Sequence, residues 1–223
     1  GYVGQHKHGV FYSEYKLMSS IKERCSLILT DKSYLKRHPL VFLVEAADTI
    51  CYSIMDIEDA LSMEWIDFDC FRKKVSEMLL EKIKNMSEDK RPPRYKDLLT
   101  PDNKGIDVDK LVKFSYDNNK LKKKNIVDFR VKVVQYLVEI TTSIFIDKLE
   151  DIDNGRYDTE LLKDDPYCLA DILGEYARAY IFSKKEIMQL EITGETVIKG
   201  LLDNVLRYVF SPEKQYRKRI QNV

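Results

Sequence analysis

The chain has 223 residues, of which 44% are hydrophobic and 33% charged, so one domain with a sizeable core and a strongly solvated surface is expected. Its 37 acidic side chains balance 37 basic ones, which argues against a globally basic nucleic-acid binder. The four cysteines form no Cys-x-x-Cys pair, so we expect a reducing, cytoplasmic setting rather than a disulfide scaffold or a structural zinc site. No run of eighteen apolar residues occurs, and no membrane partner is expected.

Helical periodicity runs through most of the chain, and no segment shows the apolar–polar alternation of a β-strand. Pro39 suits the first turn of a helix, and Ser183 with Glu186 forms a capping box for a later one. Three prolines predict a long irregular connection over 87–105, and Thr193–Gly194 predicts a joint between helices. The prediction is an all-α, irregular multi-helix fold, with helices over 13–29, 37–60, 68–86, 110–119, 126–149, 171–182, 183–192 and 197–210 and a basic terminal helix from 211.

The helix over 37–60 is the most informative segment, because a stripe of polar groups crosses an otherwise apolar sequence. Glu45, Asp48, Tyr52, Asp56 and Asp59 follow one another at steps of three, four, four and three residues. At about 100° per residue they fall within an arc of roughly 80°, so their side chains are neighbours on one side of the helix.

Two interpretations of this stripe remain open from spacing alone. A helix that is apolar nearly all round is expected to be buried, and buried carboxylates need a partner such as a metal ion. Alternatively, the stripe is the solvent face of an amphipathic helix. For the single residues the alternatives are that Asp48 pairs with an arginine, or that Tyr52 is an ordinary core aromatic. Because no lysine or arginine interrupts the stripe, a simple mixed-charge surface is the weaker explanation.

The amino-acid sequence of this segment resembles that of a known protein family. The run Arg37–Ala60, RHPLVFLVEAADTICYSIMDIEDA, is similar to the last conserved block of the dGTPase-like deoxynucleoside triphosphate triphosphohydrolases of the HD-domain superfamily, whose usual text is close to EAADDICYxIxDxEDA. The segment over 8–14, HGVFYSE, resembles the family's KxGFFxSE, and the segment over 191–202 resembles its ELxGxxVIxxLL. Thr49 departs from the family's common second aspartate.

The resemblance implies roles for three side chains. Asp48 matches the last aspartate of the superfamily's H…HD…D metal site, which would bind a divalent ion such as Mn²⁺ or Mg²⁺. Tyr52 and Asp56 match positions that hold the deoxyribose, the ring packing on the sugar and the carboxylate accepting from its 3′-hydroxyl. The implied reaction is hydrolysis of a deoxynucleoside triphosphate to a deoxynucleoside and tripolyphosphate. Glu45, Glu58 and Asp59 are expected to pair with basic groups or to support neighbours.

The chain also departs from the family in what it lacks. It contains no His-Asp dipeptide, and His6 and His8 are not expected to replace one. We therefore expect no catalytic residue in this chain, which would be the C-terminal portion of a longer enzyme of HD-domain-like fold. In that interpretation residues 1–86 complete the catalytic core, 87–125 form an irregular connection, and 126–223 form a helical region packing on the core.

Partners follow from the same resemblance and from charge. Relatives in this family are often homo-oligomers, and we expect the same here. Two basic groups would bind single-stranded nucleic acid or an allosteric nucleotide, unless they are plain solvated surface: Lys120, Lys122, Lys123 and Lys124, and Lys214, Arg217, Lys218 and Arg219. The alternatives are an HD-type phosphohydrolase acting on another phosphate ester, and a non-catalytic helical module for regulation or oligomerisation.

Overall fold

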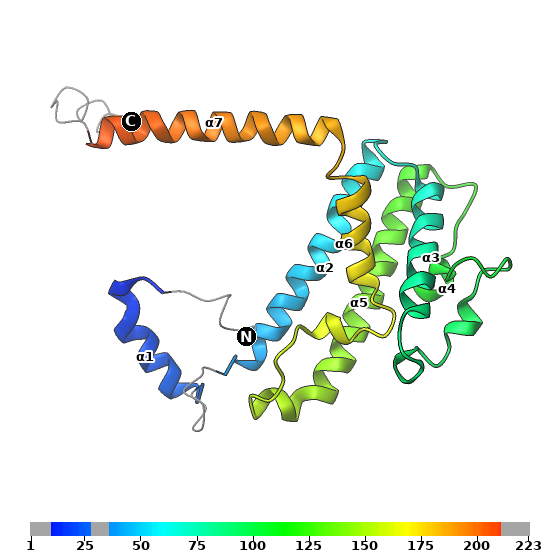
Figure 1. The fold of residues 1–223 in the computed structure, drawn as a ribbon, viewed down its shortest axis with the longest axis horizontal. Coiled ribbons are helices and arrows are strands. Elements are labelled where there is room, and N and C mark those ends of the chain that lie inside the picture. The colour runs from blue at the N-terminus through cyan, green and yellow to red at the C-terminus, as the bar shows by residue number, and fades with distance from the viewer. Residues whose placement is uncertain (1–9, 28–35, 211–223) are drawn as a thin grey trace. The chain divides into compact units, whose positions relative to one another are not determined.

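The computed structural model describes residues 10–27 and 36–210, apart from the side chain of Tyr208. In this part of the chain the regular structure consists of seven α-helices and four short 3-10 turns, with one isolated β-bridge between Leu99 and Ile106 (Figure 1). The prediction of an all-α fold is therefore confirmed. By their contacts the residues form two compact units, Gly1–Ala177 and Arg178–Val223. The predicted division of the chain into 1–86, 87–125 and 126–223 stays a prediction.

Two long helices form the centre of the first unit. α2 (Pro39–Ser62) packs along α5 (Lys122–Asp153), and the turn η5 (Leu161–Asp164) contacts both helices. α2 begins at its proline as predicted, and His38 Nδ1 accepts the free backbone N–H of Leu40 at 3.2 Å. The short helix α1 (Tyr15–Arg24) follows η2 (Tyr12–Glu14) and buries no residue.

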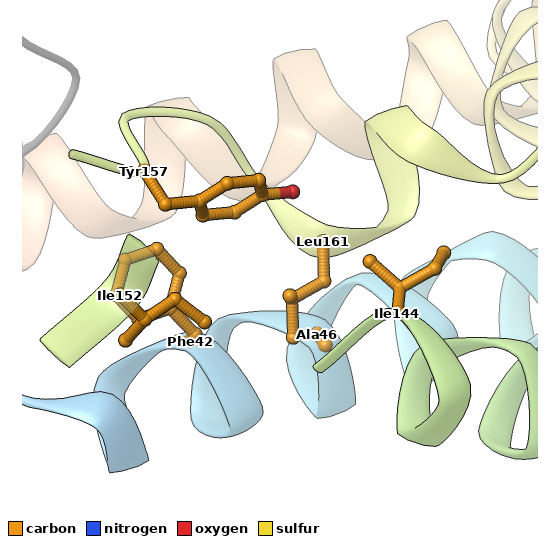
Figure 2. Packing of buried hydrophobic residues seen from close by; sticks show 6 residues of the cluster. All are labelled: Phe42, Ala46, Ile144, Ile152, Tyr157 and Leu161. Atoms are coloured by element: carbon orange, nitrogen blue, oxygen red, sulfur yellow. The ribbon is translucent and has the colours of Figure 1, made fainter. Parts of the chain in front are cut away.

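A compact apolar cluster seats the first half of α2. Figure 2 shows Phe42 and Ala46 on α2 facing side chains from α5 and from the segment that leads to η5. The ring of Phe42 lies 5.6 Å from that of Tyr157, in a tilted arrangement that suits aromatic pairs. The buried members of this cluster are Phe42, Ala46, Ile144, Ile152, Tyr157 and Leu161.

A second cluster, built on aromatic rings, holds α3 (Phe68–Lys84) and α6 (Leu169–Tyr180) to the rest of the unit. The ring of Phe71 lies 5.8 Å from Phe129 on α5 and 5.0 Å from Tyr176 on α6, both in edge-to-face geometry. Asp67 caps α3 by accepting the backbone N–H groups of residues 69 and 70 at 3.0 Å.

The segment between α3 and α5 is irregular, as expected, but it is fastened to α3. It contains η3 (Glu88–Lys90), η4 (Tyr95–Leu98) and α4 (Val108–Leu111). Ser76 Oγ donates to the carbonyl of Ile106 at 2.5 Å. A Cβ on Gly105 would lie 2.2 Å from Ser76 Oγ, so a glycine suits this position. The helix predicted over 110–119 is wrong, because α4 ends after one turn and Lys113 takes a left-handed conformation with φ 57°.

The second unit contains α7 (Lys185–Phe210), which is continuous. The joint predicted at residues 193 and 194 is wrong, because Thr193 satisfies its hydroxyl within the helix by donating to the carbonyl of Gln189 at 2.7 Å, and a single interior glycine costs a helix only about 1 kcal/mol. No described side chain of α7 is buried. His6, His8 and the basic helix expected from 211 lie outside the described residues.

Candidate functional site

One side of α2 is buried against other elements, and the opposite side is exposed. Its buried residues lie on the side that meets α5 and η5: Phe42, Ala46, Ile50, Ser53, Ile54, Ile57, Ala60 and Leu61. By helical geometry the centre of the predicted stripe lies roughly 140° away from the centre of this buried side. The expectation that the helix is buried all round is therefore wrong for the described residues, because packing partners cover one side of it only.

The residues proposed for substrate and metal lie on this outer side at successive turns. Asp48 is exposed, and the side chain of Tyr52 is 68% exposed. Neither side chain makes a hydrogen bond or ion pair with another described residue. Asp56, one turn further, is half-buried, and partial burial together with the charge of Asp59 raises the pKa of its carboxyl group. The outer side thus presents one open carboxylate, one open aromatic ring and one carboxyl group with altered acidity.

Two other acids of α2 have structural partners. Glu45 accepts a hydrogen bond from Arg37 at 2.6 Å, and Glu58 accepts one from Arg130 on α5 at 2.8 Å. The prediction that these two glutamates pair with basic groups is confirmed. Sequence spacing could not identify the arginines, because one lies before the helix and the other 72 residues along the chain. Within the stripe Glu45 is therefore paired, whereas Asp48 and Tyr52 are open, and Glu58, which lies outside the stripe, is paired as well.

An apolar strip runs beside the open groups. It consists of side chains that follow helical spacing and are exposed in the described structure: Leu40, Val44, Ala47, Cys51 and Met55. Val44 is 68% exposed and Met55 is 55% exposed. A contiguous strip of this kind on a helix is typical of a surface that another part of a protein covers.

The described residues alone do not fit a metal centre. No group of three or more histidine, cysteine, aspartate or glutamate side chains in the described ranges could hold a metal ion. Asp48 offers a single carboxylate, whereas divalent ions in enzymes take several protein or water ligands. Any metal site that uses Asp48 needs ligands from beyond residues 10–27 and 36–210.

The first basic group is partly neutralised in the structure. Lys120 pairs with Asp128 at 2.8 Å, and Lys122 pairs with Asp67 at 3.4 Å. The second group, near the carboxyl end, lies outside the described residues. Binding of nucleic acid or of a nucleotide at either group stays a prediction.

An open pocket of about 660 Å³ lies apart from α2, between α3 and the loop over 100–109. Three of its charged side chains have structural partners: Arg72 Nε donates to Asp109 at 3.0 Å, and Asp107 caps α4. This pocket could not be predicted from the sequence, because its outer wall belongs to a segment predicted only as irregular. The pocket contains none of the predicted site residues.

None of the described helices has the length and apolar character needed to cross a membrane.

Comparison with known proteins supports the family suggested by the stripe. The chain is 25% identical over 188 residues to a probable deoxyguanosinetriphosphate triphosphohydrolase of Pseudomonas aeruginosa, which covers 81% of the chain and 36% of the relative. It is 27% identical over 217 residues to a deoxyguanosinetriphosphate triphosphohydrolase-like protein of Synechocystis, covering 96% of the chain and 41% of the relative. A deoxyguanosinetriphosphate triphosphohydrolase of Cronobacter sakazakii matches at 27% over 211 residues, 92% of the chain and 37% of the relative.

These matches extend over most of the chain but over a minor part of each relative. The chain spans about 36% to 41% of the length of these three proteins. No family model matches the chain. The homologues support a relationship between this all-α chain and dGTP triphosphohydrolase-like proteins.

Proposed function

We propose that this chain is part of a deoxynucleoside triphosphate triphosphohydrolase that acts on a dGTP-like substrate. The observation that carries the proposal is the outer side of α2, where Asp48, Tyr52 and Asp56 stand at successive turns and are not used by the fold. The names of the homologues support the substrate class. Their greater length supports a parent protein in which another segment covers the apolar strip of α2.

Each of the three residues has a distinct role in this proposal. Asp48 provides one carboxylate ligand to a divalent ion such as Mn²⁺ or Mg²⁺, and the remaining ligands come from the rest of the parent protein. The ring of Tyr52 packs against the deoxyribose, and its exposure leaves it free to do so. Asp56 accepts a hydrogen bond from the 3′-hydroxyl, for which its carboxyl group has to be ionised.

The test is an assay of the complete reading frame that contains this chain beside the chain alone. We expect the complete protein to hydrolyse dGTP to deoxyguanosine and tripolyphosphate with Mn²⁺ or Mg²⁺, and the isolated chain to show no hydrolysis. Asp48→Ala in the complete protein abolishes turnover with little change in folding. The matched control is Asp147→Ala, which removes an exposed aspartate of α5 and leaves turnover intact.

Three results would change this conclusion. Wild-type turnover by Asp48→Ala refutes the ligand role, and tripolyphosphate release by the pure isolated chain refutes the shared site. Hydrolysis of another phosphate ester but not of dGTP favours the broader HD-type phosphohydrolase.

A non-catalytic assembly module is the second candidate, and α7 is the observation that favours it. Eleven of the apolar side chains of this helix are at least 44% exposed, among them Leu201 at 61% and Val205 at 52%. If the complete reading frame lacks a His…His-Asp motif and its product shows no hydrolysis, the assembly module is the better explanation.

Sedimentation of the complete protein then tests the expected homo-oligomer. Salt-dependent binding of a labelled oligonucleotide tests the role of the lysines at 120–124.

A further inference from the structure

Arg37 connects the beginning of α2 to a segment more than a hundred residues further along the chain. Its side chain is only 8% exposed. Nη1 donates to Glu45 Oε2 at 2.6 Å, and Nη2 donates to the backbone carbonyl of Thr159 at 2.9 Å. One guanidinium group thus holds the second turn of α2 and the segment before η5 at the same time.

Aromatic contacts fix the plane of this guanidinium group. Its central carbon lies 3.9 Å from the centre of the Phe42 ring, a cation–π distance. Phe42 in turn packs on Tyr157, whose hydroxyl donates to Asp164 Oδ2 at 2.9 Å. Figure 2 shows the Phe42 and Tyr157 rings in the cluster that seats this end of α2. The charged group is therefore bound at its edge by two acceptors and at its face by a ring.

We propose that Arg37 is a positioning residue, which sets the rotation and height of the first half of α2 and thereby places Asp48. The inference rests on the proposed function, because Asp48 is the residue positioned. Glu45 precedes Asp48 by three residues, so the two side chains are neighbours on the helix surface. The apolar contacts of Ala46 and Ile50 hold the opposite side of the helix but are not directional. The hydrogen bonds of Arg37 supply the directional restraint.

The pattern of satisfied groups supports a positioning role over a purely stabilising one. Arg37 Nε is buried and has no hydrogen-bond partner among the described residues. A buried ion pair with one unsatisfied donor is a poor way to gain stability, and the best-attested use of such groups is to specify one arrangement. Lysine could not replace it, because a single ammonium group lacks the planar fork that reaches two acceptors in fixed directions.

The test compares two arginines that bind acids of the same helix. Arg37→Met removes the fork and keeps an apolar stem, Arg37→Lys keeps the charge, and Arg130→Met breaks the matched pair with Glu58. Amide hydrogen exchange is measured on the purified chain. We expect Arg37→Met to raise exchange about tenfold over 40–48 and 157–161 and to leave 54–62 unchanged, with Arg37→Lys intermediate. Arg130→Met should spare 40–48.

An equal rise across all of α2, or a change of less than about twofold over 40–48, overturns the proposal. This measurement needs no activity, so it is decided separately from the proposed function. In an active complete protein, Arg37→Met is expected to lower kcat about tenfold with a smaller change in KM, and Arg37→Lys to recover part of the loss. An unchanged kcat of Arg37→Met in the complete protein also overturns the positioning role. An inactive wild-type protein counts against the proposed function, and the role of Arg37 is then decided by the hydrogen-exchange measurement alone.

Discussion

The paired and the open acids of α2 are the same kind of residue in opposite surroundings. Glu45 and Glu58 each meet an arginine held by another part of the fold. On the outer side, Asp48 meets no described partner, and Asp56 has a raised pKa. Acids that serve the fold are paired, because an unpaired charge near a protein interior is costly. One helix thus carries two sets of carboxylates, one paired with arginines of the fold and one open to solvent.

The largest contrast should appear when an aromatic ring is removed from each side of α2. Phe42 is 2% exposed in the core cluster, and Phe42→Ala is expected to lower the free energy of unfolding by about 3–5 kcal/mol, since it leaves a cavity and uncovers Arg37. Tyr52→Ala should change it by less than about 0.5 kcal/mol in this chain. Urea unfolding followed by circular dichroism measures both.

Phe42→Ala is informative only if it folds, so Phe42→Leu provides a milder variant with a smaller loss of the same sign. Equal losses at the two positions would show that the outer side of α2 is packed within this chain, which would contradict the comparison.

Much of this contrast was accessible from the sequence, but not its orientation. The apolar period and Pro39 predicted α2, and the stripe at steps of three and four placed its five members on one side. Which side faces the core depends on α5 and η5, and these partners come from contacts far along the chain. The apolar strip at Leu40 and Val44 is what made the helix look buried all round, and in the described residues nothing covers it.

Other misses have local causes that periodicity does not contain. The left-handed Lys113 ends α4 early, and Thr193 continues α7 through a glycine that the sequence marked as a joint. The site is predictable only in part for a different reason. Asp48, Tyr52 and Asp56 are predicted from spacing and resemblance, and these roles stay predictions. The contact of Arg37 with the carbonyl of Thr159 could not be predicted, because backbone carbonyls carry no sequence signature.

A smaller difference in the free energy of unfolding is expected between substitutions of a paired acid and of an open acid. Glu58→Gln weakens the bond to Arg130, and we expect it to lower the free energy of unfolding by about 1 kcal/mol, because a hydrogen bond to a charged group is lost and the side chain is only 17% exposed. Asp48→Asn should change it by less than about 0.5 kcal/mol. A double-mutant cycle with Arg130→Met isolates the pair. A coupling energy near zero would place Glu58 with the open acids.

The smallest expected effect concerns the acidity of Asp56. Partial burial is the main cause of its raised pKa, and repulsion from Asp59 adds to it. Because the folded state favours the protonated form of Asp56, this contribution to stability is fully present below the ordinary aspartate pKa and is lost as the pH rises through the higher folded pKa. Asp59→Asn removes the repulsion and should lower the pKa of Asp56 slightly without returning it to the ordinary value. Carbon-13 NMR of the Asp56 carboxyl group follows the titration.

Asp147→Asn is the control for this titration, because it removes an exposed acid from α5 and should leave the Asp56 midpoint in place. If Asp59→Asn also leaves it in place, burial alone sets the acidity, and the two aspartates do not act on each other. If the midpoint falls to the ordinary aspartate value, repulsion is the larger cause and burial the smaller. The middle result would mean that burial and the charge of Asp59 both act on Asp56, and that the fold itself disfavours the ionised form of this carboxyl group.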